Sequence, residues 1–442
     1  MSSFVASSTW IGQEQRRLDA GAFRDGGPAI RAKLDSLRPV VQRLDQVADL
    51  GYEGRFARVY VDDPSRGIPF LTGSDMLLLD LKGLPYLSRA RTSQVRSLAV
   101  RDGWSLISRS GTIGRVAFAR REMLGLALSD DVIRAIPRPG EILAGYLFAF
   151  LSSRHAQVMI HQRTYGSVVQ HIEPAHIADL PVPIPDEREA ETIDRLVLGA
   201  AGARTEAATL LDTASAHFDS LGPRLRYSHE HERSEGVVAN IGLGRRLDAF
   251  YHVGWTSEAR LREGDRLGDL GPVSRPGMIK RLFVKRGVPF VSGVDIYQTR
   301  PSFRSRLMKV EAERAKAFVT AGQIVVQRSG QRYGLLGRPA LIGGRLDGYA
   351  ASDHLMRISP ESSEARARIF AFLRSEVGRR SLVRTSYGTS IPTLNPEGLA
   401  EQRVPVLPEA LIKAAERALQ LREQADADED EAIRKVEAWL DS

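Results

Sequence analysis

Short apolar runs and longer apolar stripes alternate along this chain and predict a mixed fold of strands and helices. Runs of four or five mostly apolar residues between Gly-rich turns are typical of strands. Such runs occupy residues 68–71, 104–107, 116–119, 288–291 and 323–327. Residues 143–163 and 366–383 are instead apolar at the spacing of a helix. The pattern predicts an α/β (α+β) architecture in both halves of the chain.

Two further stretches, residues 186–221 and 409–440, predict long amphipathic helices. In both, apolar residues recur at steps of three and four. The acidic pair Asp186-Glu187 favours a helix start because it faces the positive end of the helix dipole, and Gly222-Pro223 favours its end. Helices of this length span roughly 45–50 Å and need a partner along their length. We expect them to pair with each other as an antiparallel coiled coil.

The chain repeats itself at a period of about 220 residues, which indicates a duplicated domain rather than an array of short repeats. Six matches keep the same order in both halves, so chance similarity is a poor explanation. The matches pair RRLDAGAF at Arg16 with RRLDAFYH at Arg245, IPFLTGSDM at Ile68 with VPFVSGVDI at Val288, LISRSG at Leu106 with VVQRSG at Val325, SDDVIRAIP at Ser129 with SDHLMRISP at Ser352, FAFL at Phe148 with FAFL at Phe370, and YGS at Tyr165 with YGT at Tyr387.

The repeat and the two helices define the expected domains. Residues 1–185 form the first globular domain and residues 241–408 the second. The helices that follow them cover residues 186–222 and 409–442, and residues 223–240 form a polar linker.

Charge is spread unevenly along the chain and suggests a polyanionic partner. The formal net charge is +8, but residues 186–222 and 409–442 each carry −5, which leaves +18 on the remainder. Such an excess is typical of proteins that bind nucleic acid, although an Arg-rich composition alone could also produce it. The chain has no cysteine, which excludes disulfides and thiolate metal sites. Without a leader pattern or an apolar run long enough to span a membrane, we expect a soluble cytoplasmic protein.

The sequence holds no convincing catalytic or metal-binding motif. It lacks the GK[ST] of a phosphate-binding loop, and it lacks the Gly-rich turn and aromatic tetrapeptide of a DNA methyltransferase. Asp80-Leu81-Lys82 has the local look of a nuclease strand end, but a solvated strand end explains it better. His171 and His176 are separated by Pro174, so a loop histidine is a better interpretation than a metal pair. We therefore expect no catalytic residue, no metal and no cofactor in this chain.

The RSG sequence, at Arg109 and again at Arg328, follows a predicted strand in both copies. Its arginine could hold a phosphate or donate two hydrogen bonds to a guanine edge; a surface strand-to-turn corner is the simpler alternative. The residues that follow differ between the copies, which is the pattern expected of two domains that read different sequences. The DNA-binding candidates of this motif are Arg109, Ser110, Thr112, Arg328, Ser329, Gln331, Arg332 and Tyr333.

The Tyr-Gly stretches show the same combination of a shared frame and variable polar residues. Gln and His side chains are suited to base edges, and the alternative is a plain connection from a helix to the Pro-rich strand. The candidates are Tyr165, Ser167, Gln170, His171, Tyr387, Thr389 and Ser390. A basic run of the second copy adds Lys280 and Arg281, with Lys285 and Arg286 beside them, as phosphate contacts.

Taken together, these motifs resemble the specificity (S) subunit of Type I restriction-modification systems. The resemblance covers most of the chain. It rests on RLDA near the start of each half, on the Tyr-Gly stretches that lead into PVPIP and PVLP, and on the long helix after each. The chain departs from the family at the openings of these helices, DEREAETI and EALIKAAE, where a Glu-Gln pair is usual.

The resemblance implies a non-catalytic DNA-recognition subunit. Each half would be a target recognition domain for one half of a split DNA site, and the paired helices would set the spacing and dock two methyltransferase (M) subunits. Restriction (R) subunits would complete the complex, and the partner subunits would use S-adenosylmethionine, ATP and Mg²⁺. Two alternatives stay open: a DNA-binding scaffold of another phage-defence complex, and a nuclease acting through Asp80.

Overall fold

The structure of the chain, a computed structural model, describes residues 27–36, 41–93, 95–163, 171–222, 263–303, 305–332, 334–388 and 390–441. Both RLDA motifs, the linker 223–240 and the site candidates Tyr165, Ser167, Gln170, Tyr333 and Thr389 lie outside the described residues. The chain divides into two compact units. Unit 1 comprises Met1–Thr205 with Gln424–Ser442, and unit 2 comprises Glu206–Glu423.

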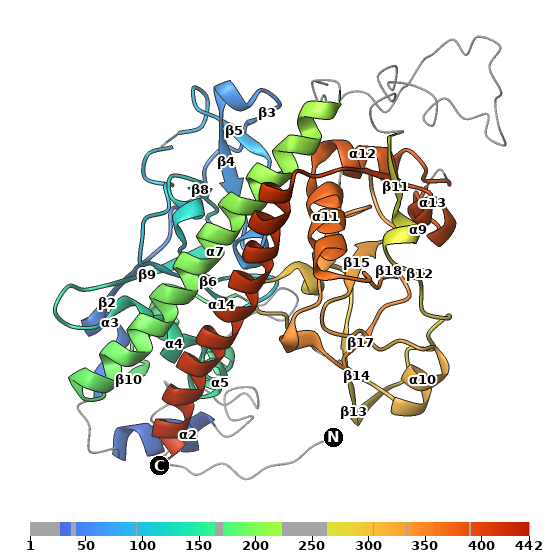
Figure 1. The fold of residues 1–442 in the computed structure, drawn as a ribbon. Coiled ribbons are helices and arrows are strands. Elements are labelled where there is room, and N and C mark those ends of the chain that lie inside the picture. Colours follow the sequence, from blue (N-terminus) through green and yellow to red (C-terminus); the bar gives the residue numbers. More distant parts are fainter. Residues whose placement is uncertain are drawn as a thin grey trace. The chain divides into compact units, whose positions relative to one another are not determined.

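The strands of unit 1 form two four-stranded sheets and one two-stranded sheet among the described residues (Figure 1). The first sheet is antiparallel and has the order β2 (Ala48–Gly51), β9 (Val132–Pro137), β6 (Ser105–Ser108), β7 (Val116–Phe118). The second has the order β3 (Tyr60–Val61), β5 (Tyr86–Ser88), β4 (Gly67–Leu71), β8 (Ala127–Leu128), with β4 and β8 parallel. The third pairs β1 (Val41–Arg43) with β10 (Pro181–Pro183).

Apart from β3, which has no counterpart among the described residues of unit 2, this topology recurs in unit 2 and confirms the duplicated fold predicted from the sequence. Its first sheet has the order β12 (Val273–Ser274), β18 (Leu355–Ile358), β15 (Ile324–Gln327), β16 (Pro339–Leu341). Its second has the order β14 (Ser305–Leu307), β13 (Phe283–Val291), β17 (Ala350–Ala351), and its third pairs β11 (Gly264–Arg266) with β19 (Arg403–Pro405). The one parallel pairing recurs at matching residues, Phe70 with Ala127 and Phe290 with Ala350.

Short helices complete both units. The α-helices are α2 (Gly27–Ser36), α3 (Leu44–Val47) and α6 (Pro174–Ile177) in unit 1, and α9 (Leu267–Leu270), α10 (Lys309–Arg314) and α13 (Pro396–Ala400) in unit 2. The single 3-10 turns are η2 (Pro64–Arg66), η3 (Asp75–Leu77), η4 (Arg121–Met123), η6 (Gly293–Tyr297) and η7 (Gly344–Leu346).

Residues 143–163 and 366–383, which the apolar spacing marks as helical, each form two helices rather than one. The pairs are α4 (Ala144–Ser152) with α5 (Arg154–Gln162), and α11 (Ser363–Arg374) with α12 (Glu376–Val383). A serine in extended conformation lies at each break, and its hydroxyl caps the second helix. The Ser153 hydroxyl accepts from the Ala156 amide at 3.3 Å, and that of Ser375 accepts from the Gly378 amide at 2.9 Å. Apolar periodicity continues across the break, so it does not reveal the cap.

The two long helices are α7 (Glu187–Leu221) and α14 (Glu409–Asp441), close to their predicted bounds. The Asp186 carboxylate caps the start of α7 by accepting from the Glu189 amide at 3.0 Å. In unit 1, the first half of α7 and the last half of α14 share one buried cluster. In unit 2, the end of α7 and the first half of α14 both pack on α11, through Phe218 against Phe372 and Arg422 against Phe370. These contacts confirm the predicted antiparallel pairing (Figure 1).

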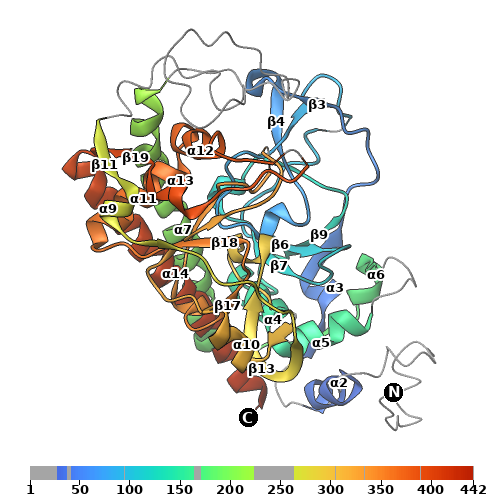
Figure 2. The ribbon, with the colours of Figure 1, turned by 90° about the vertical axis from the view of Figure 1, so that its right-hand side faces the viewer.

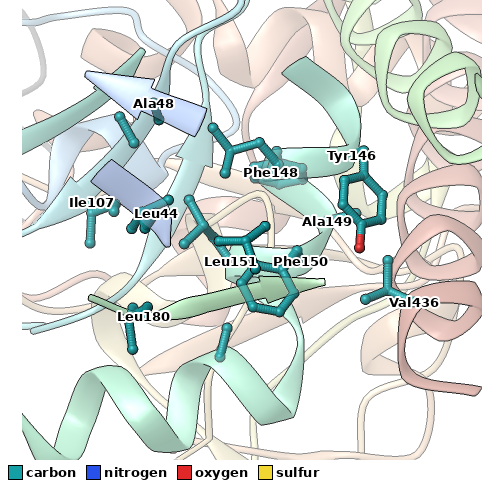
Figure 3. Close-up of a cluster of buried hydrophobic side chains, with 14 of the residues drawn as sticks. Leu44, Ala48, Ile107, Tyr146, Phe148, Ala149, Phe150, Leu151, Leu180 and Val436 are labelled. Atoms are coloured by element: carbon teal, nitrogen blue, oxygen red, sulfur yellow. The ribbon is translucent and has the colours of Figure 1, made fainter. Parts of the chain in front are cut away.

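The core of unit 1 joins its first sheet to the long helices. Figure 3 shows α4 presenting Phe148 toward the strands and Tyr146 toward Val436 of α14. The Tyr146 hydroxyl donates to the Pro183 carbonyl at the end of β10. Because β10 is the element immediately before α7, this buried bond fixes where the helix leaves the globular part.

Candidate nucleic-acid interface

In unit 1, the structure brings the RSG motif and the end of the Tyr-Gly stretch together. Ser110, just after β6, forms an antiparallel bridge with His171, and the Ile172 amide donates to the Arg109 carbonyl at 3.2 Å. The Arg109 amide donates in turn to the Asp131 carbonyl at 2.9 Å. We define corner 1 as Arg109, Ser110, His171 and Ile172.

Unit 2 builds the same arrangement with different side chains. Ser329 bridges Thr393, and the Leu394 amide donates to the Arg328 carbonyl at 2.8 Å. The Arg328 amide donates to the His354 carbonyl at 2.8 Å. We define corner 2 as Arg328, Ser329, Thr393 and Leu394. Two motifs that the sequence offers as separate candidates therefore lie together in each unit.

The loop between Tyr387 and Thr393 closes on itself beside corner 2. The two residues exchange backbone hydrogen bonds of 2.9 and 2.8 Å. Gly388 has a φ of +91°, a conformation that residues other than glycine rarely adopt, so the turn favours glycine at this position. The loop leaves Tyr387 47% and Ile391 64% exposed, and Ser390 is exposed as well. It exposes an aromatic, an aliphatic and a hydroxyl group at the surface of unit 2.

Turns just after the corners carry the remaining described candidates of the RSG motif. Ser108 anchors the first turn, because its hydroxyl donates to the Thr112 carbonyl and accepts from the Arg115 amide. In unit 2, Gln331 is exposed and its carbonyl accepts from the Gly334 amide at 3.0 Å. The Arg332 carbonyl accepts from the Arg379 guanidinium at 3.2 Å, which ties this turn to α12.

The guanidinium of Arg109 is engaged within unit 1. It donates to the Glu173 carboxylate, lies 3.9 Å from the Asp131 carboxylate and stacks 4.4 Å above the Tyr52 ring, so its side chain is only 18% exposed. A hydrogen bond to Glu173 raises the pKa of the Tyr52 hydroxyl. The sequence did not indicate Tyr52 and Glu173 as partners, because they lie 57 and 64 residues from Arg109. The simpler alternative for Arg109, a corner residue with structural contacts, fits this geometry.

The basic run of unit 2 does not join corner 2. Lys280 and Arg281 precede β13 and are exposed, as are Lys285 and Arg286 in its first half. At the other end of β13, the Val291 carbonyl accepts a hydrogen bond from the amide of Ser352, which begins the Ser-Asp-His sequence before β18. Among the described residues these four cations make no ion pair with a carboxylate. We call these four residues the basic edge. The strand β13, which carries two of them, lies beside α10 (Figure 2).

The backbone of this basic edge is fixed by Glu311 of α10. Its carboxylate accepts from the Lys280 amide at 2.6 Å and from the Arg314 guanidinium, and these bonds lower the pKa of Glu311 to about 2. Large apolar side chains are exposed along the same edge, among them Met278, Leu282 and Phe283. The edge therefore combines positive charge with apolar surface.

Potential metal ligands do not gather in the described part of the chain. No group of three or more such residues occurs in these ranges. Asp80, the candidate nuclease acid, accepts from the Lys82 amide at 3.2 Å. None of the helices described has the length and apolarity to cross a membrane.

Comparison with known proteins gives matches to solved structures. No protein-family model matches the chain, and no curated protein matches it. The Type-I restriction-modification S subunit from M. genitalium is 12% identical, with 92% of this chain and 95% of that chain covered and a TM-score of 0.32. The HsdS subunit from Thermoanaerobacter tengcongensis is 15% identical, with 91% and 95% covered and a TM-score of 0.28. A structure from work on assembly and conformational transition of the type I R-M system is 13% identical, with 90% and 98% covered and a TM-score of 0.28. Because these TM-scores are low, the function proposed for the chain rests on its own residues.

Proposed function

We propose that the chain is the DNA-specificity subunit of a Type I restriction-modification complex. In this proposal it catalyses nothing, and its two globular domains each read one half of a bipartite site in double-stranded DNA. The observation that carries the proposal is the corner built twice, with bridges Ser110–His171 and Ser329–Thr393 in the same topology and different polar residues around them. A constant frame with variable contact residues is what reading two different half-sites requires.

Charge supports a nucleic-acid partner. The residues outside the two long helices carry most of the positive charge, while both helices are acidic. Phosphate contacts by Lys and Arg supply much of the affinity of DNA-binding proteins. The acidic helices are then suited to a different task, and we assign to them the docking of two methyltransferase subunits and the spacing of the half-sites. Restriction subunits would join the assembly through these partners.

The decisive experiment maps methylation in cells. The chain is co-expressed with a candidate adenine methyltransferase partner, and methylated bases are located across the host DNA. We expect methylation at a split motif, two short sequences separated by a fixed gap of unspecified bases. Methylation at one uninterrupted short site would contradict the proposal.

A domain exchange tests whether the two halves read independently. Residues 1–185 are replaced with the corresponding domain of another specificity subunit, and the recognised motif is mapped again. We expect one half of the motif to change and the other to remain. A change in both halves would exclude independent reading.

A non-specific DNA-binding scaffold is distinguished by competition. The chain is bound to a labelled duplex that carries the mapped motif, at fixed salt, and challenged with mixed-sequence DNA. A specific reader holds the labelled duplex against excess competitor, whereas a scaffold exchanges it freely.

A further inference from the structure

The two corner arginines have the same backbone environment but opposite electrostatic surroundings. The backbone amides of Arg109 and Arg328 donate to the carbonyls of Asp131 and His354, which stand two residues after Ser129 and Ser352 of the repeated Ser-Asp motif. The backbone carbonyls of the two arginines accept from the amides of Ile172 and Leu394, which follow the bridge residues His171 and Thr393. The matching bonds identify Asp131 with His354, and Ile172 with Leu394. Their side chains can therefore be compared position by position.

Glu173, Asp131 and Tyr52, which contact the Arg109 side chain, are all replaced in unit 2. Glu173, which accepts from Arg109, corresponds to Asn395, the residue after Leu394. Asp131 corresponds to His354. Arg109 stacks on Tyr52, the residue after Gly51, and Gly51 pairs with Arg134 between β2 and β9. In unit 2 the equivalent pair is Ser274 with Arg357, so the residue equivalent to Tyr52 is Arg275. Where unit 1 has two acidic residues and a tyrosine, unit 2 has an asparagine, a histidine and a second arginine.

Arg328 consequently lacks an acidic partner among the described residues. Its Nε donates to the Leu394 carbonyl at 3.1 Å, which holds the side chain beside the bridge. Its two Nη atoms make no hydrogen bond or ion pair with a described residue, and neither is a buried, unsatisfied nitrogen. The Asn395 side chain is already used, since it accepts from the Gly398 amide at 2.8 Å to cap α13. The outer edge of the Arg328 guanidinium thus remains for a ligand.

We infer that Arg328 is the corner arginine that contacts DNA, whereas Arg109 is held by Glu173 and positions its own corner. The ligand of Arg328 is a pair of closely spaced acceptor atoms, offered either by the O6 and N7 of a guanine or by phosphate oxygens. The guanidinium of Arg109 would have to leave Glu173, Asp131 and Tyr52 to make the same contact. The inference rests on the proposed function, because it names which residue of the repeated corner recognises DNA.

The test compares matched variants of the full-length chain. The wild type selects from a pool of random-sequence DNA duplexes, and the selected motif is then used to measure binding by Arg328→Ala, Arg109→Ala and Asn395→Glu. The last variant places a carboxylate at the start of α13, just as unit 1 has Glu173 at the start of α6. This carboxylate should pair with the Arg328 guanidinium and keep it from DNA, although the arginine itself is retained. Arg403→Ala, an exposed arginine on β19 that donates to the Gly264 carbonyl, is the baseline.

We expect Arg328→Ala and Asn395→Glu to weaken binding by about 5- to 150-fold with loss of preference at one base of one half-site. If the acceptors are phosphate oxygens, binding weakens for all sequences and the log–log salt slope falls by about 1. Either result supports the inference and tells the two acceptors apart. Arg109→Ala is expected to lower the thermal stability and to leave both half-site preferences intact.

The failure of the inference differs from the failure of the proposed function. If the wild type selects a motif and Arg328→Ala binds it like Arg403→Ala, the inference is wrong and the proposed function stands. The same holds if Arg109→Ala, still folded by circular dichroism, removes a base preference. If the wild type selects no motif at all, the proposed function fails and the inference fails with it.

Discussion

Arg204 on α7 and Glu429 on α14 form an ion pair in which each side chain is only 4% exposed. Arg204 also donates to the Asp426 carboxylate at 2.8 Å. Burial disfavours the charged guanidinium, but the two carboxylates raise the pKa of Arg204 above its ordinary value. Because these residues lie on facing turns within unit 1, the pair sets the register of α7 against α14 there.

Glu429→Ala should destabilise unit 1 strongly. Removing Glu429 leaves the buried Arg204 with a single carboxylate partner among the described residues, Asp426, and breaking a buried pair costs up to roughly 3–5 kcal/mol. Urea denaturation followed by far-ultraviolet circular dichroism measures the change in the free energy of unfolding. Glu431→Ala is the matched control, since Glu431 lies on the same helix and pairs with Arg434 at the surface, where about 1 kcal/mol or less is expected. Equal losses in the two variants would contradict a special role for the Arg204 pair.

Two glycines of unit 1 should respond to alanine in opposite directions. A Cβ on Gly145 of α4 would lie 2.8 Å from the Asp194 backbone carbonyl of α7, so Gly145→Ala forces the two helices apart. Overpacking of this kind costs about 1–3 kcal/mol. Gly199, inside α7, has no atom within 4 Å of its added Cβ, and Gly199→Ala should stabilise the helix by about 1 kcal/mol. Thermal melts of both variants test the close approach of α4 to α7; a stabilised Gly145→Ala would refute it.

Local and periodic features of the fold could be predicted from the sequence. The sequence predicted the strands at residues 68–71 and 104–107, both long helices and the duplication. Each of these features depends on residues close together in the chain or on repeated sequence motifs. The breaks at Ser153 and Ser375 were not predicted, because one hydroxyl decides them while the apolar stripe continues.

The two motifs of the candidate site were identified from the sequence, but their contact with each other was not. The Ser110–His171 bridge between the RSG and Tyr-Gly motifs depends on a pairing between distant segments that no periodicity encodes. The ion pair between Arg109 and Glu173 could not be predicted for the same reason. Arg204 was not singled out from the sequence, although a charge among the alanines of the apolar stripe is a signal that could have marked it.

The two capping serines should contribute similar stability to their own units. Ser153→Ala and Ser375→Ala each remove the side-chain acceptor at the start of a helix, and each should cost about 1 kcal/mol. Ser220→Ala is a suitable control because its hydroxyl donates to the His217 carbonyl on an exposed turn at the end of α7. Chemical denaturation of the three variants gives the comparison. If the capping variants unfold like Ser220→Ala, the breaks are set by packing and not by the serines.

The cations Lys285 and Arg286 of the basic edge should contribute to DNA binding through their charge. Lys285 and Arg286 are exposed on β13 and make no ion pair with a described carboxylate, so they are suited to phosphates. Replacing both with alanine should lower the log–log salt slope of DNA binding by up to about 1.8, near 0.9 for each lost contact, without changing the preferred sequence. Fluorescence anisotropy over a range of salt concentrations measures the slope.

The matched control for this edge replaces Lys413 and Arg434 on α14. Both already pair with carboxylates of their own helix, Glu409 and Glu431, so their removal should leave the slope nearly unchanged. A similar fall in both double variants would mean that binding follows net charge rather than this edge. A change of preferred sequence in the Lys285 and Arg286 variant would instead show that the edge reads bases, because a phosphate contact carries no sequence information.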